Sequence, residues 1–280
     1  AAPWNIELNN EPKNLVNVLV NNFKNNVTVN KIIFESPYDE VIDRATPHHF
    51  PLVRIPTTGS TYLYDQDCVT GDASTYRDTL DEIITYLTSN NIAISFDLHW
   101  SCPDPTKMTG CATDQAPMAL REYGAGNNGT LEFWDQVSKK YASNPLVFYE
   151  LYNEPYLKKG EFDTYYAGDD TYVGMKEMYD VVRKNDPNGL IIIAGMQSYT
   201  FDSATQIALW LKYYQDTGKY LKNVLFNFHP YQGNSQGTEK AVAPALRLLL
   251  SSKTIAPVIM TEFGQYCCGA NVQTCPGNPN

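Results

Sequence analysis

Two glutamates of the sequence stand just after apolar runs that have the length of β-strands. Glu154 follows Leu146–Leu151 within an Asn-Glu-Pro motif, and Glu262 follows Pro257–Thr261. Two carboxyl groups that face one glycosidic bond can break it, because one donates a proton to the leaving oxygen while the other attacks or supports the anomeric carbon. The alternative is that these glutamates bind strand-end amides or an arginine, but the presence of both at strand ends favours catalysis.

Apolar runs rich in Val, Ile, Leu and Phe alternate along the chain with longer helix-like stretches. This alternation predicts βα units and a parallel sheet, and strands that are apolar throughout are typical of a sheet covered on both faces. The predicted strands are Leu52–Ile55, Ile92–Leu98, Leu146–Leu151, Leu190–Ala194, Val224–Phe228 and Pro257–Thr261, with a weaker one at Leu15–Val20. The predicted helices lie around Ala73–Asn90, Thr130–Ser143, Tyr172–Asn185, Ser203–Gln215 and Thr238–Ser252.

The architecture that best fits this rhythm is of the α/β class, a (β/α)8 TIM barrel whose working face lies at the C-terminal ends of the strands. Glu154 and Glu262 are 108 residues apart, which is about three βα repeats, and strands three apart face each other across the mouth of a barrel. A doubly wound open sheet is the alternative, but the chain lacks the G-x-G-x-x-G turn that usually begins one.

Other polar residues close further predicted strands, namely Arg54, His99 and His229. His229 begins a His-Pro-Tyr motif on the strand before that of Glu262, so His229 and Tyr231 are placed to reach this carboxylate. For a lone strand-end histidine, a structural role is an equal alternative. Trp100 follows His99 and is expected to face the barrel mouth.

Two other motifs are better explained as loops. Ser235 lies in a G-x-S-x-G match, but all four histidines precede it, whereas the hydrolase triad needs a histidine after the serine. His48 and His49 have no third ligand at metal-binding spacing, so a solvated loop pair is favoured. We therefore expect no metal and no cofactor.

The composition excludes several classes of protein. The chain has 280 residues and a net charge of −10, which disfavours binding to nucleic acid or to an anionic membrane surface. No apolar run has the length of about 20 residues that a membrane span needs. Tyr is abundant, with 20 residues, and combines an apolar ring with a hydroxyl that suits a polyhydroxylated ligand.

The cysteines and sequons predict an extracellular setting. There are six cysteines, of which Cys102 and Cys111 flank a short polar loop and are expected to pair, while the other pairings stay open. Asn26 and Asn128 each begin an N-glycosylation sequon. Together with the acidity, these features indicate a secreted, disulfide-bonded glycoprotein.

Five short motifs, in order between about residues 50 and 264, resemble those of glycoside hydrolase family five, in the clan of retaining (β/α)8 glycosidases. They are Val53-Arg54-Ile55-Pro56, Asp97-Leu98-His99-Trp100, Tyr152-Asn153-Glu154-Pro155, His229-Pro230-Tyr231 and Thr261-Glu262-Phe263-Gly264. The resemblance implies that Glu154 is the acid/base and Glu262 the nucleophile.

The resemblance also implies supporting roles. Asn153 would bind the sugar 2-hydroxyl, Arg54 would hold Glu262 ionised, and Tyr231 would bond to Glu262. The two histidines, His99 and His229, would contact the sugar at the cleavage subsite.

The C-terminal region departs from the family pattern. In this family an eighth strand follows the nucleophile and carries a tryptophan beneath the substrate, whereas only 18 residues follow Glu262 and none is tryptophan. We expect a single barrel domain over residues 1–280, with an N-terminal hairpin at about 1–14 and an eighth βα unit missing from the sequence given. The alternatives are that Tyr266, Trp100 or Trp4 lies beneath the substrate instead, or that the barrel is incomplete.

The most specific hypothesis is a retaining endo-β-1,4-glucanase, a cellulase that acts on β-glucan as a monomer. An endo-β-1,4-mannanase is the close alternative, because the same family contains both activities. A non-catalytic carbohydrate-binding barrel is the alternative from another class, although a pure binder would not need two paired carboxylates.

Overall fold

The computed structural model describes residues 52–64, 76–100, 116–124, 126, 128–196, 203–229, 231–232, 256–262 and 264–265. Its centre is a parallel sheet with the strand order β1-β2-β3-β4-β5-β7. These strands are β1 (Leu52–Thr58), β2 (Ala93–Trp100), β3 (Val147–Glu150), β4 (Leu190–Ile193), β5 (Val224–Phe228) and β7 (Val258–Met260). Each predicted strand in this part of the chain is thus present.

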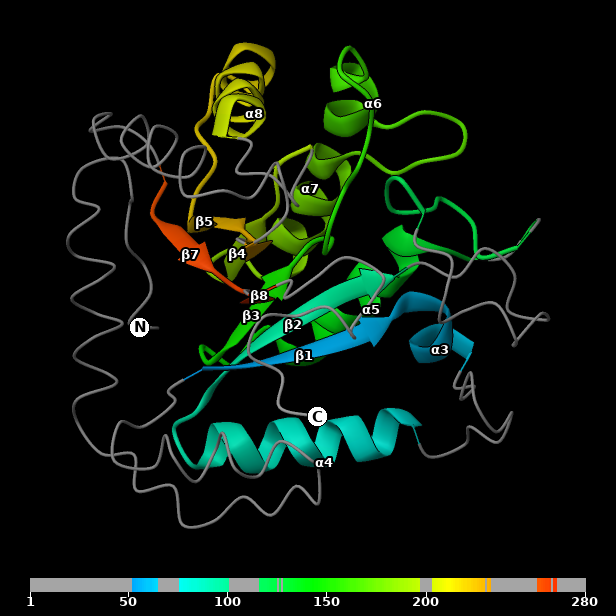
Figure 1. Ribbon diagram of the computed structural model, residues 1–280. Helices are drawn as coiled ribbons and strands as arrows, with labels where there is room; N and C mark the ends of the chain where they lie inside the picture. The colour runs from blue at the N-terminus through cyan, green and yellow to red at the C-terminus, as the bar shows by residue number, and fades with distance from the viewer. Residues whose placement is uncertain are drawn as a thin grey trace, which may run out of the picture.

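From β1 to β5, helices connect successive strands and lie outside the curled sheet (Figure 1). The longer ones are α4 (Tyr76–Ser89), α5 (Thr130–Tyr141), α7 (Met175–Asn185) and α8 (Ser203–Thr217), and two short ones, α3 (Gly59–Tyr64) and α6 (Phe162–Ala167), were not predicted. Parallel strands joined through outer helices form part of a (β/α)8 barrel, which confirms the predicted fold class.

Some predictions fall outside the described residues. These are the strand at Leu15–Val20, the helix at Thr238–Ser252, the N-terminal hairpin and all six cysteines.

After Glu262 the structure describes β8 (Gly264–Gln265), which pairs with β6 (Tyr231–Gln232) in a separate two-stranded sheet. In the described part of the chain, no helix combines the length and the apolar character that crossing a membrane requires. Asn128 is exposed just before α5, while Asn26 is not described.

A tight turn ends α4 and leads into β2. Asn91 has a φ of 60°, a left-handed conformation that Asn tolerates better than most residues. It lets the amide of Ile92 donate to the carbonyl of Leu87 at 3.0 Å, which closes the end of α4. The chain then reverses, and β2 begins at Ala93.

The outer face of the sheet packs on the helices through large aromatic side chains. Trp134 of α5 is fully buried and meets Tyr149 of β3 edge-on, with ring centroids 6.2 Å apart. Phe133 of the same helix contacts Phe96 of β2 and Tyr62 of α3. Edge-to-face pairs of this kind add to the hydrophobic burial, so this layer fixes α5 against the strands.

Side chains alternate between the two faces along a strand, so every second residue faces inward. The inward-facing side chains form two layers. The lower layer is apolar and contains Ala93, Phe148, Leu190, Ile192 and Leu225, with Leu52 and Ile259 against it. The upper layer, nearer the C-terminal strand ends, is polar and contains Arg54, Ser95, Asp97, Glu150, Asn227 and Thr261. The expectation that the strands are apolar throughout is therefore wrong for this layer.

Arg54 also differs from its predicted position at a strand end. The strand β1 continues to Thr58, and Arg54 pairs with Ser95 inside the sheet. Its side chain therefore rises from within the barrel wall toward the upper layer.

Candidate active site

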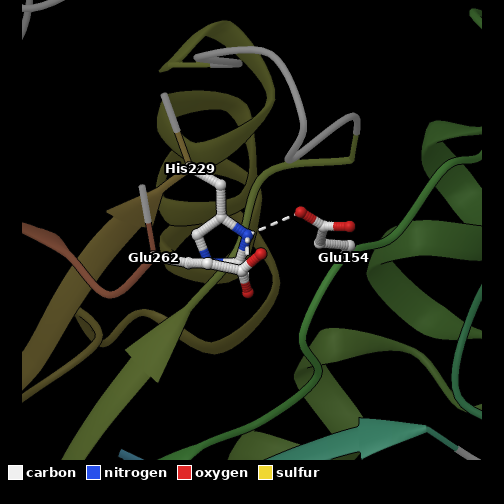
Figure 2. A group of neighbouring side chains, drawn as sticks. All are labelled: Glu154, His229 and Glu262. Carbon is white, nitrogen blue, oxygen red and sulfur yellow. Dashed lines mark hydrogen bonds and ion pairs between the residues drawn. The ribbon is translucent and has the colours of Figure 1, made fainter. Parts of the chain in front are cut away.

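Glu154 and Glu262 come together at the C-terminal ends of two strands that face each other (Figure 2). Glu154 follows β3 and Glu262 follows β7, and the sheet order places β4 and β5 between them. One carboxylate oxygen of each glutamate and Nδ1 of His229 all lie within 4.8 Å of one another. The predicted pair of carboxyl groups is thus assembled in space.

The three side chains differ in their access to solvent. Glu154 and Glu262 are 21% and 27% exposed, whereas the His229 side chain is fully buried. The carboxyl groups can therefore meet a ligand, while the imidazole supports them from behind.

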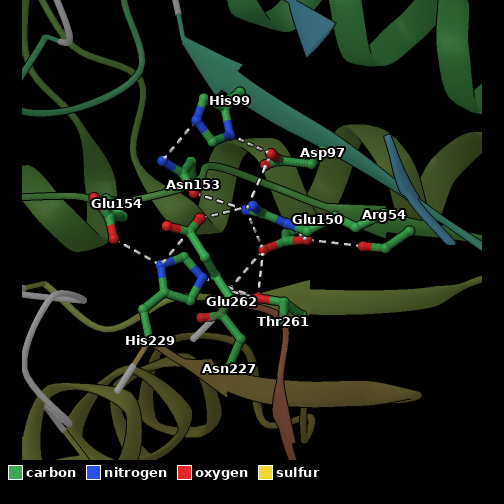
Figure 3. Close-up of polar contacts among 11 residues, drawn as sticks. Arg54, Asp97, His99, Glu150, Asn153, Glu154, Asn227, His229, Thr261 and Glu262 are labelled. Carbon is green, nitrogen blue, oxygen red and sulfur yellow. Dashed lines mark hydrogen bonds and ion pairs between the residues drawn. The ribbon is translucent and has the colours of Figure 1, made fainter. Parts of the chain in front are cut away.

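Arg54 binds several acceptors with one guanidinium group (Figure 3). Its Nη1 donates to Oε2 of Glu262 at 2.9 Å, and its Nε and Nη2 donate to the two oxygens of Glu150, each at 2.9 Å. Nη2 also donates to Oδ1 of Asn153 at 2.7 Å and lies 3.0 Å from Oδ2 of Asp97. A cation at this distance favours the ionised form of a carboxyl group, and the predicted role of Arg54 toward Glu262 stays a prediction.

Glu150 is a buried carboxylate that sequence reasoning missed. Besides Arg54, it accepts hydrogen bonds from Ser95 Oγ at 2.7 Å, Asn227 Nδ2 at 2.8 Å and Thr261 Oγ1 at 2.9 Å. Burial acts to raise the pKa of Glu150, but the charge and hydrogen bonds of Arg54 outweigh it, and the net pKa is lowered. Glu150 is therefore an ionised anchor beneath the site.

Asp97 is the second buried carboxyl group that the sequence analysis did not single out as a site residue. Burial and then the nearby charge of Glu150 raise the pKa of Asp97 to about 6, although Arg54 and His99 act in the opposite direction. Its Oδ2 lies 2.7 Å from Nδ1 of His99. A polar residue at alternate positions of an apolar strand was the available signal for both Asp97 and Glu150.

His229 contacts Glu154 more closely than Glu262. Its Nδ1 lies 2.7 Å from Oε1 of Glu154 and 3.8 Å from Oε2 of Glu262. Its Nε2 lies 2.9 Å from Oγ1 of Thr261. The ring is therefore buried and both of its nitrogens have a polar contact. The expected contact between His229 and the sugar stays a prediction.

The remaining predicted site residues lie around this centre. Asn153 is buried, and its Nδ2 lies 3.5 Å from Nε2 of His99. Trp100 is half-buried, with its ring centroid 5.2 Å from that of His99. Tyr231 lies in β6 with a side chain outside the described residues, and Tyr266 is also outside them. The roles predicted for these residues stay predictions.

The group of Glu154, His229 and Glu262 has the compactness of a cation site. Both ring nitrogens of His229 already take part in hydrogen bonds, to Glu154 and Thr261. The predicted acid–base role of this group stays a prediction.

Comparisons with known proteins identify the family of this chain. A sequence model described as Cellulase (glycosyl hydrolase family 5) matches residues 13–275, while no curated protein matches the sequence. Cel5A (EG2) from Hypocrea jecorina (Trichoderma reesei) is similar in structure, with a TM-score of 0.53 and 16% identity over 80% of this chain and 74% of that chain. The catalytic domain of Thermobifida fusca endoglucanase Cel5A has a TM-score of 0.45 and 18% sequence identity, over 81% of this chain and 64% of that chain. This chain thus spans less than two thirds of the Thermobifida domain.

Proposed function

The chain belongs to the cellulase family, glycosyl hydrolase family 5, and on that premise we propose that it is a retaining endo-β-1,4-glucanase. Its substrate would be the interior of a β-glucan chain. Glu154 would serve as the acid/base and Glu262 as the nucleophile.

The observation that carries this proposal is the separation of the two carboxyl groups. Retaining glycosidases hold them about 5–5.5 Å apart, whereas inverting enzymes need roughly 6.5–9.5 Å to admit a water molecule. The oxygens of Glu154 and Glu262 that approach each other lie within 4.8 Å. This spacing favours direct attack by Glu262 on the sugar.

The reaction would then proceed in two displacements. Glu154 gives its proton to the glycosidic oxygen while a carboxylate oxygen of Glu262 bonds to the anomeric carbon, and the bond to the leaving sugar breaks. In the second step Glu154 takes a proton from water, the resulting oxygen attacks the anomeric carbon, and Glu262 leaves as a carboxylate. Arg54, at 2.9 Å from Glu262, stabilises this carboxylate before and after the covalent stage.

Hydrolysis of a panel of polysaccharides tests the proposal. We expect reducing ends to be released from carboxymethylcellulose, and Glu154→Gln and Glu262→Gln each to lower kcat by about 10³-fold or more, because each removes an essential proton or nucleophile. Glu132→Gln is the matched control, since Glu132 lies on α5 and bonds to Gln136 away from the site.

Other outcomes would replace the proposal. Faster release from galactomannan than from carboxymethylcellulose would make the protein a mannanase. Binding of both polymers without any cleavage would make it a carbohydrate-binding barrel.

A further inference from the structure

A chain of hydrogen bonds leads from beneath the site to the proposed acid/base (Figure 3). It runs from Glu150 to Thr261 at 2.9 Å, from Thr261 to Nε2 of His229 at 2.9 Å, and from Nδ1 of His229 to Glu154 at 2.7 Å. The direction in which each bond donates decides where the protons lie.

The chain begins at an oxygen that can only accept. Glu150 accepts hydrogen bonds from Nε and Nη2 of Arg54 and from the hydroxyl of Ser95, and these contacts favour its ionised form in the interior. An ionised carboxylate has no proton to give. The contact between Thr261 Oγ1 and Glu150 Oε1 therefore uses the hydroxyl proton of Thr261.

Thr261 then determines the tautomer of His229. A threonine hydroxyl has one proton, and after donating it to Glu150 its oxygen can only accept from the histidine. The proton of the neutral imidazole must therefore lie on Nε2, which leaves Nδ1 without one. This bare nitrogen faces Glu154.

We propose that Thr261 and Glu150 are positioning residues that lock His229 in its Nε2–H tautomer and so keep a mobile proton between Nδ1 and Glu154. This inference rests on the proposed role of Glu154 as the acid/base. The mobile proton is the one that Glu154 gives to the leaving oxygen. After that transfer, an imidazole lone pair and a carboxylate face each other without a proton between them, which favours the return of a proton from water in the second step.

Other charged groups surround the pair of Glu154 and His229. In the described part of the chain these are Glu262 from the end of β7, Glu150 from β3, Arg54 from β1, and Asp97 and His99 from β2. Their charges are the same in a variant that alters only the hydroxyl of Thr261. A change seen in such a variant therefore reports on the hydrogen-bond chain.

Two substitutions of Thr261 test the role of its hydroxyl group. Thr261→Val removes the hydroxyl and keeps the branched side chain, while Thr261→Ser keeps the hydroxyl. Thr57→Val is the control, because Thr57 is buried on the other face of β1 and its hydroxyl has no hydrogen-bond partner among the described residues.

Nitrogen-15 NMR of the full chain, labelled at histidine, reads the tautomer directly. The chain has four histidines, so a His229→Gln variant identifies the signals of His229. The spectra are recorded at a pH above the basic limb of the pH–rate profile, which is the range where activity falls because Glu154 has lost its proton. There we expect a protonated Nε2 and an unprotonated Nδ1 in the unsubstituted protein, in Thr261→Ser and in Thr57→Val. In Thr261→Val we expect the proton on Nδ1, where it donates to the ionised Glu154.

The pH dependence of kcat/KM on a soluble cello-oligosaccharide provides the second readout. The new hydrogen bond in Thr261→Val stabilises ionised Glu154, so the basic limb should move to lower pH by about one unit while the acidic limb stays in place. Thr261→Ser should restore the original limb.

Two results would overturn the inference. One is a proton on Nδ1 of His229 in the unsubstituted protein, which decides the question even if Thr261→Val does not fold. The other is an Nε2–H tautomer that persists in folded Thr261→Val. If the unsubstituted protein cleaves no glycan, the proposed function fails, while the tautomer can still be measured.

Discussion

Arg54 connects the buried carboxylates to the proposed nucleophile, because its planar fork reaches Glu150 and Glu262 at the same time. A lysine keeps the charge but cannot form the bidentate bond. We expect Arg54→Lys to lower kcat about 100-fold and to lower the melting temperature. Steady-state kinetics and a thermal melt followed by circular dichroism would measure these effects.

Arg121→Lys is the matched control for this substitution. Arg121 also makes a two-pronged contact with a glutamate, Glu177, but does so near the start of α7. It should leave kcat unchanged. An Arg54→Lys variant with full activity would show that the fork is dispensable.

Asp97 links the pH to the stability of the fold. Its pKa is about 6 in the folded protein and near 3.8 when unfolded, so the folded state binds more protons between these values. Stability contributed by the protonated group is therefore present at low pH and is lost as the pH rises through about 4–6.

Asp97→Asn removes this penalty at neutral pH. We expect the free energy of unfolding of the variant, relative to the unsubstituted protein, to rise by more than about 1 kcal/mol between pH 4 and pH 7. Urea titrations of both proteins at the two pH values would measure the difference. A difference in the free energy of unfolding that stays constant between the two pH values would contradict the raised pKa of Asp97.

At the scale of elements, α5 supports the segment that carries Glu154. Trp134 is fully buried, and its Nε1 donates to the carbonyl of Leu151, just beyond β3, at 3.2 Å. Trp134→Ala should lower the free energy of unfolding by about 3–5 kcal/mol, because it opens a cavity between α5 and β3.

Urea denaturation measures this loss, with Tyr86→Ala of α4 as the control. Tyr86 is 50% exposed, so its truncation should cost less than about 0.5 kcal/mol. Equal losses in the two variants would show that α5 is not fixed by this side chain.

The central strands β3, β4 and β5 were predictable from the sequence because they are buried on both faces. β4, for example, is an unbroken run of Leu and Ile, and its four residues are all buried. The short helices α3 and α6 were missed because six residues are too few to show a helical period. The wrong end of β1 has a similar cause, since Pro56 and the threonines after it interrupt the apolar run.

The site was predictable where a polar residue follows a strand, as for Glu154 and Glu262. It was not predictable where the partner of a side chain depends on register. Asp97 lies opposite Glu150 because β2 pairs with β3 in one particular alignment, and nothing in either strand alone specifies it. The contact between His229 and Glu154 likewise joins residues that lie 75 positions apart.

At the scale of the whole molecule, the barrel combines an apolar lower layer with a charged upper layer. The apolar residues around Phe148 and Ile192 form the lower layer on the inner face of the sheet, and the polar network around Arg54 lies above them, nearer the C-terminal strand ends. The cost of burying Asp97 and Glu150 is offset by Arg54 and its hydrogen-bond partners. In this arrangement the fold positions the two glutamates through a network that spans β1, β2, β3, β5 and β7.

The central claim is that Glu154 and Glu262 cleave a β-glycosidic bond by two displacements, and the configuration of the first product tests it most directly. Proton NMR during hydrolysis of a cello-oligosaccharide distinguishes the two anomers before they interconvert. The account predicts that the β-anomer appears first, because two inversions at the anomeric carbon retain its configuration. Initial formation of the α-anomer would contradict it.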